Sequence, residues 1–361
     1  MKKKIILSTG GTGGHIYPMV ALHDYLVSKN FEVIFVSDQR AMKYFNLDVK
    51  EKVKIFNINS PFNKKGFYKL MAYCQLLVST IKSIFFLINN KPSIIIGSGG
   101  YASFPILMAG YLLKINILIY ETNSILGRTN KFFYFLSKKL LLGYDNQKYL
   151  PKKYQKKSIY VGQLLRKSFT EKRNEANIFN PNKNEFTILM LGGSQGAEFF
   201  GSRFATIFSE LKNSGFKIKI FHQCKENQVE SIRQAYQNFT NYELFEFNPN
   251  IEKIMKQSDL AIVRSGSSTI SELIAVSLPF IAIPLPSSMD NHQYYNAKYF
   301  EDRGCCWLID QNQFDAEKFK KLIADILGND KEKLREKIKN IKLLNQDQAL
   351  NNFEKIIIKY L

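Results

Sequence analysis

The chain has 361 residues, which is long for a single hydrophobic core and predicts two domains. Hydrophobic residues make up 45% and charged residues 23%, as in a soluble globular protein. The four cysteines form no CxxC pair, so neither a disulfide framework nor a zinc site is implied, and a reducing, cytoplasmic compartment is expected.

The net charge of +20 is unevenly distributed. Residues 1–165 contain 24 Lys and Arg against 7 Asp and Glu, whereas the remainder contains 27 against 24. No acidic residue occurs between Lys52 and Tyr120. This asymmetry predicts an anionic partner, either nucleic acid or a membrane surface. A generally lysine-rich composition is the alternative.

Short apolar runs separated by amphipathic stretches predict buried parallel strands alternating with helices. The first series of strands is expected at 4–8, 32–37, 94–97, 117–121 and 140–142. The second is expected at 187–191, 217–222, 242–247, 260–263 and 280–284. The apolar run at residues 5–7 is too short for a signal peptide and fits the first strand. The predicted fold class is α/β, with two doubly wound parallel-sheet domains and a boundary near residues 163–186.

The segment at 66–91 is long enough to cross a bilayer, but polar residues such as Lys69 and Lys82 interrupt it. It is interpreted as an amphipathic or core helix. An interfacial role at a membrane and packing on its own sheet are both open.

Three glycine-rich loops follow predicted strands and precede helical patterns: STGGTGGH, GSGGYASFP and LGGSQGAEFF. Glycine lets the backbone approach a phosphate, and the N-terminus of the next helix offers N–H groups to it. In the second half, RSGSSTISE places small hydroxyl residues before Glu272, a carboxylate suited to ribose hydroxyls. None of the loops fits a P-loop or a dinucleotide fingerprint.

The motifs GGTGGHIYP, GSGGYAS, ETN, LGGSQGA, RSGSSTISE and DNHQYYNA occur in an order that resembles the MurG family over essentially the whole chain. The resemblance implies the GT-B architecture, with residues 1–163 and 345–361 in an N-terminal acceptor domain and 164–344 in a UDP-GlcNAc-binding domain. It implies an inverting, metal-independent transferase that moves GlcNAc from UDP-GlcNAc to lipid I, giving lipid II. Another GT-B enzyme on the same donor, such as a non-hydrolysing 2-epimerase, is the alternative. A nucleic-acid partner is not expected, because no recognised binding motif is present.

The resemblance also implies site residues. Positions matching donor contacts are Thr12, Gly13, Gly14, Asn123, Arg166, Ser194, Asn248, Ser267, Ser268, Thr269, Ile270, Ser271, Glu272 and Gln293. Positions expected to hold the acceptor diphosphate are Gly13, Gly14, Gly99, Gly100 and Tyr101. Tyr120, Thr122 and Asn248 depart from the family pattern.

His15 is the predicted general base, because an imidazole suits removal of a proton from the attacking hydroxyl. Glu121 is the alternative base, and a purely structural role for His15 is also open. No cofactor and no metal are expected, since no Asp-x-Asp motif occurs in the sequence.

The resemblance implies peripheral attachment to the cytoplasmic face of the bacterial inner membrane, with cell-wall or division machinery as a further partner, and the basic N-terminal half fits an anionic membrane surface. The residues expected to dock on the anionic membrane are Lys64, Lys65, Phe67, Lys69 and Lys82.

Overall fold

The computed structural model describes residues 3–11, 13–45, 53–56, 65–145, 150–170, 185–193, 198–236, 239, 241–328, 331–344 and 348–361. The chain divides into two compact units. Residues Met1–Arg166 and Gln346–Leu361 form the first unit, and Lys167–Asn345 form the second.

The first unit contains a parallel sheet whose described strands run in the order β3-β2-β1-β4-β5-β6-β7. The strands are β1 (Lys4–Ser8), β2 (Glu32–Ser37), β3 (Val53–Ile55), β4 (Ile94–Gly97), β5 (Asn116–Glu121), β6 (Lys139–Leu142) and β7 (Ser158–Tyr160). The chain leaves β1 toward β2 and returns to β4 on the other side of β1, so β1 and β4 form a switch point. In open α/β sheets, ligands bind at the carboxyl ends of the strands at such a point.

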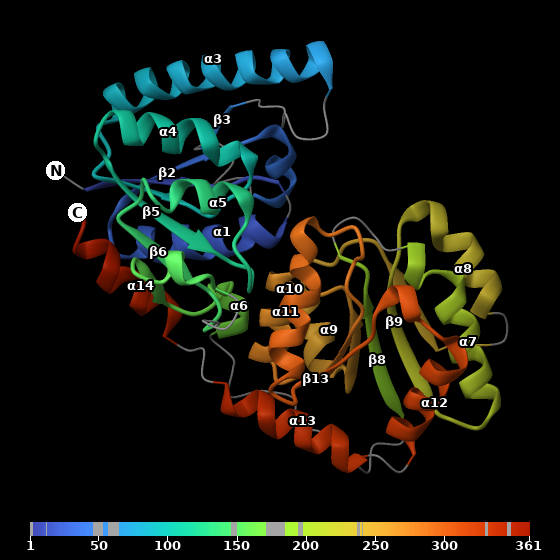
Figure 1. The fold of residues 1–361 in the computed structure, drawn as a ribbon. Coiled ribbons are helices and arrows are strands. Elements are labelled where there is room, and N and C mark those ends of the chain that lie inside the picture. The colour runs from blue at the N-terminus through green and yellow to red at the C-terminus, as the bar shows by residue number, and fades with distance from the viewer. Residues whose placement is uncertain are drawn as a thin grey trace. The chain divides into compact units, whose positions relative to one another are not determined.

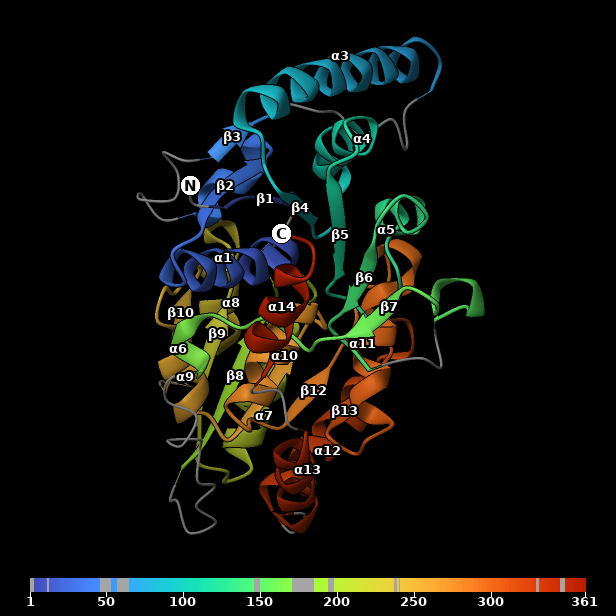
Figure 2. The same cartoon turned by 90° about the vertical axis from the view of Figure 1, so that its left-hand side faces the viewer.

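Helices cover both faces of this sheet (Figures 1 and 2). They are α1 (Gly13–Ser28), α3 (Gly66–Asn90), α4 (Phe104–Leu112), α5 (Arg128–Phe133) and the C-terminal α14 (Ala349–Ile358). Helices α1 and α14 share one apolar core with the sheet, and α4 and α5 share the other. Helix α3 lies across α4 as the outermost element of this face (Figure 2).

Helix α14 joins the first unit although it ends the chain. The ring of Phe353 meets that of Tyr120 edge-on at 5.0 Å, and the Tyr25 hydroxyl donates to Glu354 Oε2 at 2.6 Å. The Asn116 amide donates to the Tyr360 carbonyl at 2.9 Å. The last residues therefore complete the core around β5.

The second unit contains a parallel sheet whose described strands run in the order β10-β9-β8-β11-β12-β13. The strands are β8 (Phe186–Leu191), β9 (Ile218–Gln223), β10 (Tyr242–Phe245), β11 (Leu260–Val263), β12 (Phe280–Ala282) and β13 (Cys306–Leu308). The helices are α6 (Lys167–Thr170), α7 (Ser202–Asn213), α8 (Val229–Tyr236), α9 (Ile251–Gln257), α10 (Ser267–Ala275), α11 (His292–Glu301), α12 (Ala316–Leu327) and α13 (Lys331–Leu343). The switch point lies between β8 and β11.

The predicted fold class, two doubly wound parallel sheets, is confirmed. Strands β1, β2, β4 and β11 have the predicted bounds. Strands β3, β7 and β13 were not predicted, and each is a three-residue strand at the edge of its sheet. An edge strand has a neighbouring strand on one side only and is partly exposed, so it lacks the continuous apolar run that is typical of a buried central strand.

Candidate functional site

Two glycine turns meet at the switch point of the first sheet. Gly99 and Gly100, after β4, have φ values of 90° and 76°. A Cβ atom at Gly10 would lie 2.4 Å from the Cβ of Ala102, and one at Gly100 would lie 2.9 Å from the Gly10 carbonyl oxygen. Only glycine allows the two backbones this close approach. Burial raises the pKa of the following Tyr101 to about 12, so its hydroxyl remains protonated at neutral pH.

His15 lies in the first turn of α1, directly behind the first glycine turn, and is half-buried. The Thr9 hydroxyl donates to the His15 carbonyl oxygen at 3.0 Å. The Ser98 hydroxyl donates in turn to Thr9 Oγ1 at 2.9 Å. These bonds fix the His15 backbone to the carboxyl ends of β1 and β4.

Arg166 lies beside the same helix. Its guanidinium stands over the Tyr17 ring, 4.6 Å from the centroid. A Cβ at Gly13 would lie 3.0 Å from Tyr17 Cε2, so Arg166, Gly13 and the adjoining Gly14 gather at the start of α1. A cation together with a helix N-terminus favours a bound anion.

Glu121 ends β5 and is 1% exposed. Its Oε1 accepts from the backbone N–H of Asn123 at 2.9 Å and from the Asn123 side-chain amide at 3.1 Å. Its Oε2 accepts from the Gly127 N–H and from the Asn130 amide, both at 2.8 Å. Four bonds occupy the acceptor sites of a carboxylate. Glu121 is therefore arranged to hold the loop that carries Asn123, not to take a proton.

Two departures from the family pattern flank Glu121 and belong to the interior. The Tyr120 hydroxyl accepts from the Leu164 N–H and donates to the Gly162 carbonyl, both at 3.1 Å, and burial raises its pKa far above the usual value. The carbonyl of Thr122 accepts from the Gln163 amide at 2.9 Å. Both residues tie β5 to the segment that leads out of the first unit.

In the second unit, Gly193 follows β8 with a φ of 79°. A Cβ there would lie 3.9 Å from the Cβ of Arg264, which follows β11. Helix α10 begins after Gly266, which has no side chain with which to cap the first N–H groups. Glu272 is buried in the second turn, beyond the position of a capping box.

The small residues of α10 differ in what they can offer a ligand. Ser268 and Thr269 are half-buried in the first turn. Ile270 is fully buried, and the Ser271 hydroxyl donates to the Ser267 carbonyl at 2.8 Å. The side chains of Ile270 and Ser271 therefore pack and hydrogen-bond within the protein, so a ligand at these positions would contact backbone atoms.

Two further residues predicted to bind the sugar nucleotide belong to the second unit: Gln293 lies in the first turn of α11, and Asn248 lies in the loop before α9. Gln293 Oε1 accepts a hydrogen bond from the Leu285 N–H at 3.0 Å. The NH2 group of the same amide can therefore donate a hydrogen bond to a sugar hydroxyl. Asn248 Oδ1 accepts from the Asn250 N–H at 2.8 Å, next to the 68% exposed Phe247. The side-chain carbonyl of Asn248 therefore closes a turn before α9. Thr12, Ser194 and Lys64 lie outside the described residues.

Helix α3 presents a wide apolar surface to solvent. Its large apolar side chains that are 43–71% exposed are Phe67, Tyr68, Leu70, Met71, Tyr73, Leu77, Val78, Ile81, Phe85 and Ile88. By length and composition the helix could cross a membrane, and only 28% of its most apolar window is buried. One side of the helix packs on the first unit through α4, as one of the two interpretations expects, and the opposite face is exposed. Lys69 and Lys82 are exposed on the same helix, and the exposed Lys65 directly precedes it.

Arg264 is the first residue of the RSGSSTISE motif, but it was not among the predicted site residues. It donates from Nη1 to the carbonyls of Ile283 and Pro284, both at 2.9 Å, and lies over the rings of Phe199 and Phe200. Burial lowers its pKa to about 10, which still leaves it cationic at neutral pH. A lone arginine directly after a buried strand was the available signal.

Family models match both halves of the chain. Residues 5–142 match the glycosyltransferase family 28 N-terminal domain, and residues 187–356 match the family 28 C-terminal domain. With two parallel-sheet domains, each with glycine turns at its switch point, the fold and the site define a glycosyltransferase of the GT-B class.

The similar proteins indicate the family to which the chain belongs within this class. A UDP-N-acetylglucosamine–N-acetylmuramyl-(pentapeptide) pyrophosphoryl-undecaprenol N-acetylglucosamine transferase of Pelagibacter ubique is 36% identical over 99% of this chain and 98% of its own. The protein of that name from Rickettsia canadensis is 39% identical over 91% of this chain and 92% of its own. The chain belongs to this transferase family, the MurG family.

Solved structures agree on the fold. The Acinetobacter baumannii MurG structure has a TM-score of 0.78 at 24% identity and covers 99% of both chains. A UDP-N-acetylglucosamine 2-epimerase has a TM-score of 0.65 at 12% identity, covering 100% of this chain and 97% of its own. At these identities the likeness concerns the architecture alone.

Proposed function

We propose that this protein transfers N-acetylglucosamine from UDP-N-acetylglucosamine to the N-acetylmuramyl-pentapeptide of an undecaprenyl diphosphate lipid, which yields lipid II for peptidoglycan. The observation that carries the proposal is the full-length similarity to transferases of this name, at 36% identity over 99% of the chain. The donor would lie against the turns after β8 and β11, and the acceptor against the turns after β1 and β4.

The proposed reaction is a single displacement with inversion. The C4 hydroxyl of the acceptor attacks the anomeric carbon, the bond to UDP breaks, and the hydroxyl proton passes to the His15 imidazole. The position of His15 at the carboxyl edge of the sheet supports this role. The four bonds to Glu121 argue against the alternative base.

The leaving diphosphate gains negative charge as the bond breaks. The positive end of the α10 dipole and the cationic Arg264 provide a positive potential for it without a metal ion.

The primary test is an assay with radiolabelled UDP-N-acetylglucosamine and a lipid I analogue, with and without EDTA. We expect label in the lipid under both conditions. His15→Ala should lower kcat at least ~100-fold, because positioned base catalysis contributes about 10²–10⁴-fold. His23→Gln, two turns along the same helix, is the control. Label that remains on the nucleotide as an epimeric sugar would instead favour the 2-epimerase.

We also propose peripheral attachment to an anionic membrane through the exposed face of α3. This face combines apolar side chains with lysines, and no acidic residue occurs between Lys52 and Tyr120. A pocket of about 530 Å³ beside it, between β3 and α3, is lined by Lys54, Lys82 and Asn89 among others. Apolar area and attraction to anionic lipid together determine such binding.

Vesicle sedimentation tests the attachment. The protein should bind vesicles containing anionic lipid more strongly than neutral ones, and salt should weaken the binding. Leu77→Glu should reduce binding, whereas Leu343→Glu, which changes a 73% exposed leucine on α13, should not. Equal sedimentation with neutral and anionic vesicles at low salt would contradict the proposal.

A further inference from the structure

Three turns converge at the carboxyl ends of β1, β2 and β4. The turns after β1 and β4 touch through Gly10 and Gly100, as described above. The turn after β2 joins them, because a Cβ at Gly10 would lie 3.6 Å from Asp38 Oδ2. Asp38 is 3% exposed and caps the following helical turn by accepting from the Ala41 N–H at 3.2 Å.

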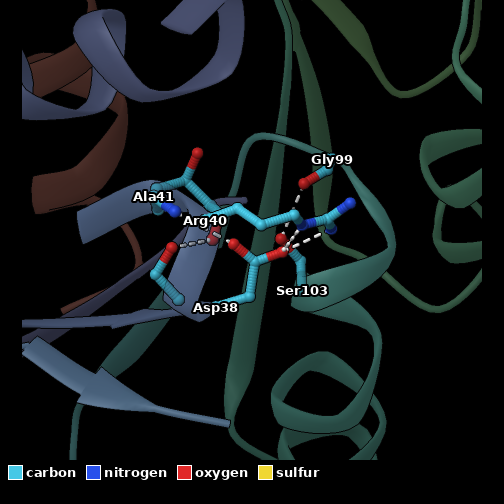
Figure 3. A network of polar contacts seen from close by, with 7 residues as sticks. Asp38, Arg40, Ala41, Gly99 and Ser103 are labelled. Atoms are coloured by element: carbon cyan, nitrogen blue, oxygen red, sulfur yellow. Dashed lines mark hydrogen bonds and ion pairs between the residues drawn. The ribbon is translucent and has the colours of Figure 1, made fainter. Parts of the chain in front are cut away.

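Arg40 is fixed above this junction by Asp38 (Figure 3). Its Nε donates to Asp38 Oδ2 at 3.0 Å, and its Nη2 donates to the same oxygen. Figure 3 shows the Arg40 side chain extending across the Asp38 carboxylate in the direction of the turn that carries Gly99 and Ser103. The Ser103 hydroxyl donates to the Gly99 carbonyl at 2.7 Å and holds that turn in place.

The arrangement leaves donors for a ligand. A guanidinium has five N–H groups, and the described bonds of Arg40 use two of them. The Arg40 side chain is 67% exposed although its carboxylate partner is 5% exposed. An exposed cation held by a buried carboxylate loses little conformational freedom when it binds an anion.

We propose that Arg40 binds the diphosphate of the lipid-linked acceptor, with Asp38 as the residue that positions the guanidinium. This rests on the proposed function, because the acceptor in the relatives' name carries a pyrophosphoryl group. A planar guanidinium matches phosphate oxygens by paired bonds. The glycine turns beside it let the diphosphate reach backbone N–H groups at the start of α1.

Steady-state kinetics with two acceptors test this assignment. One acceptor carries the diphosphate, and the other has an uncharged spacer in its place with the same sugar, peptide and lipid. Arg40→Gln should lower kcat/KM for the diphosphate acceptor about 10–100-fold, mostly through KM, since a hydrogen bond to a charged group is worth about that factor. The value for the neutral acceptor and the KM for the donor should change less than about threefold.

Two further variants define the role. Arg40→Lys keeps the charge without the fork and should recover part of the loss. Arg335→Gln removes a 52% exposed arginine that pairs with Glu332 in the second unit, and should have no effect. An unchanged acceptor KM in Arg40→Gln, or an equal loss with both acceptors, would overturn the proposal.

Binding of farnesyl diphosphate, measured by titration calorimetry, separates this assignment from the proposed function. If the wild-type protein transfers nothing but binds farnesyl diphosphate more tightly than Arg40→Gln does, the function is wrong and the anion site stands. If the wild type transfers sugar and the two proteins bind farnesyl diphosphate equally, the function stands and Arg40 is not its ligand.

Discussion

Replacing Glu121 by glutamine separates a structural from a catalytic role for this carboxyl group. Glutamine has the same shape but carries an NH2 group where glutamate has its second oxygen. Its carbonyl can still accept two of the four bonds, while the NH2 faces two N–H donors. Two charge-assisted bonds of about 1.5–3 kcal/mol each are lost, so we expect a loss of about 3–6 kcal/mol in unfolding free energy.

This loss is a large part of the about 5–15 kcal/mol that stabilises a typical domain. Urea unfolding followed by circular dichroism should show a lower midpoint for the first unit. Trp307, the single tryptophan of the chain, lies on β13, and its fluorescence should report an unchanged second unit. Hydrogen exchange should also accelerate at one of the two backbone amides, Asn123 or Gly127, namely the one that faces the new NH2 group and loses its acceptor.

The matched control is Glu32→Gln, because Glu32 is 48% exposed and pairs with Lys4 on the surface of the same unit. Surface pairs contribute about 0–1 kcal/mol, so its midpoint should barely move. The reasoning fails if Glu121→Gln unfolds and exchanges like the wild type yet loses kcat at least ~100-fold. That result would make Glu121 the proton acceptor.

Two other substitutions test the packing and the pH dependence. Gly100→Ala should destabilise the first unit by about 1–3 kcal/mol, because it combines a φ of 76° with a contact of 2.9 Å to the Gly10 carbonyl; equal urea midpoints for variant and wild type would contradict this. Burial lowers the pKa of His222 to about 4, below its usual 6.5, so the unfolded chain binds more protons between these values. The second unit should therefore lose about 3 kcal/mol as the pH falls from 6.5 to 4, measured by Trp307 fluorescence in urea. His222→Gln should flatten this dependence, and an unchanged slope in that variant would refute the assignment.

The sequence by itself determined the class of fold and most of the central strands. Continuous apolar runs appear where a strand is covered on both faces, which is why β1, β4 and β11 could be predicted from local pattern. Glycine turns after these strands marked the switch points, because a close backbone approach excludes a side chain. The order of the six motifs indicated the family.

Tertiary structure decided which residues meet. Asp38 and Gly10 come together only because β1 pairs with β2, and Gly100 reaches Gly10 only because β4 returns to the other side of β1. The role of Glu121 depends on donors up to nine residues away, a loop geometry that no periodicity encodes.

The outer face of α3 shows the same limit. Its composition is equally compatible with a core helix and with an exposed one, because periodicity records which residues are apolar but not what lies against them. Packing on α4 buries one side and leaves the rest in solvent. Local sequence thus determined the elements and their turns, whereas long-range contacts determined which cations, glycines and apolar faces became available to a ligand.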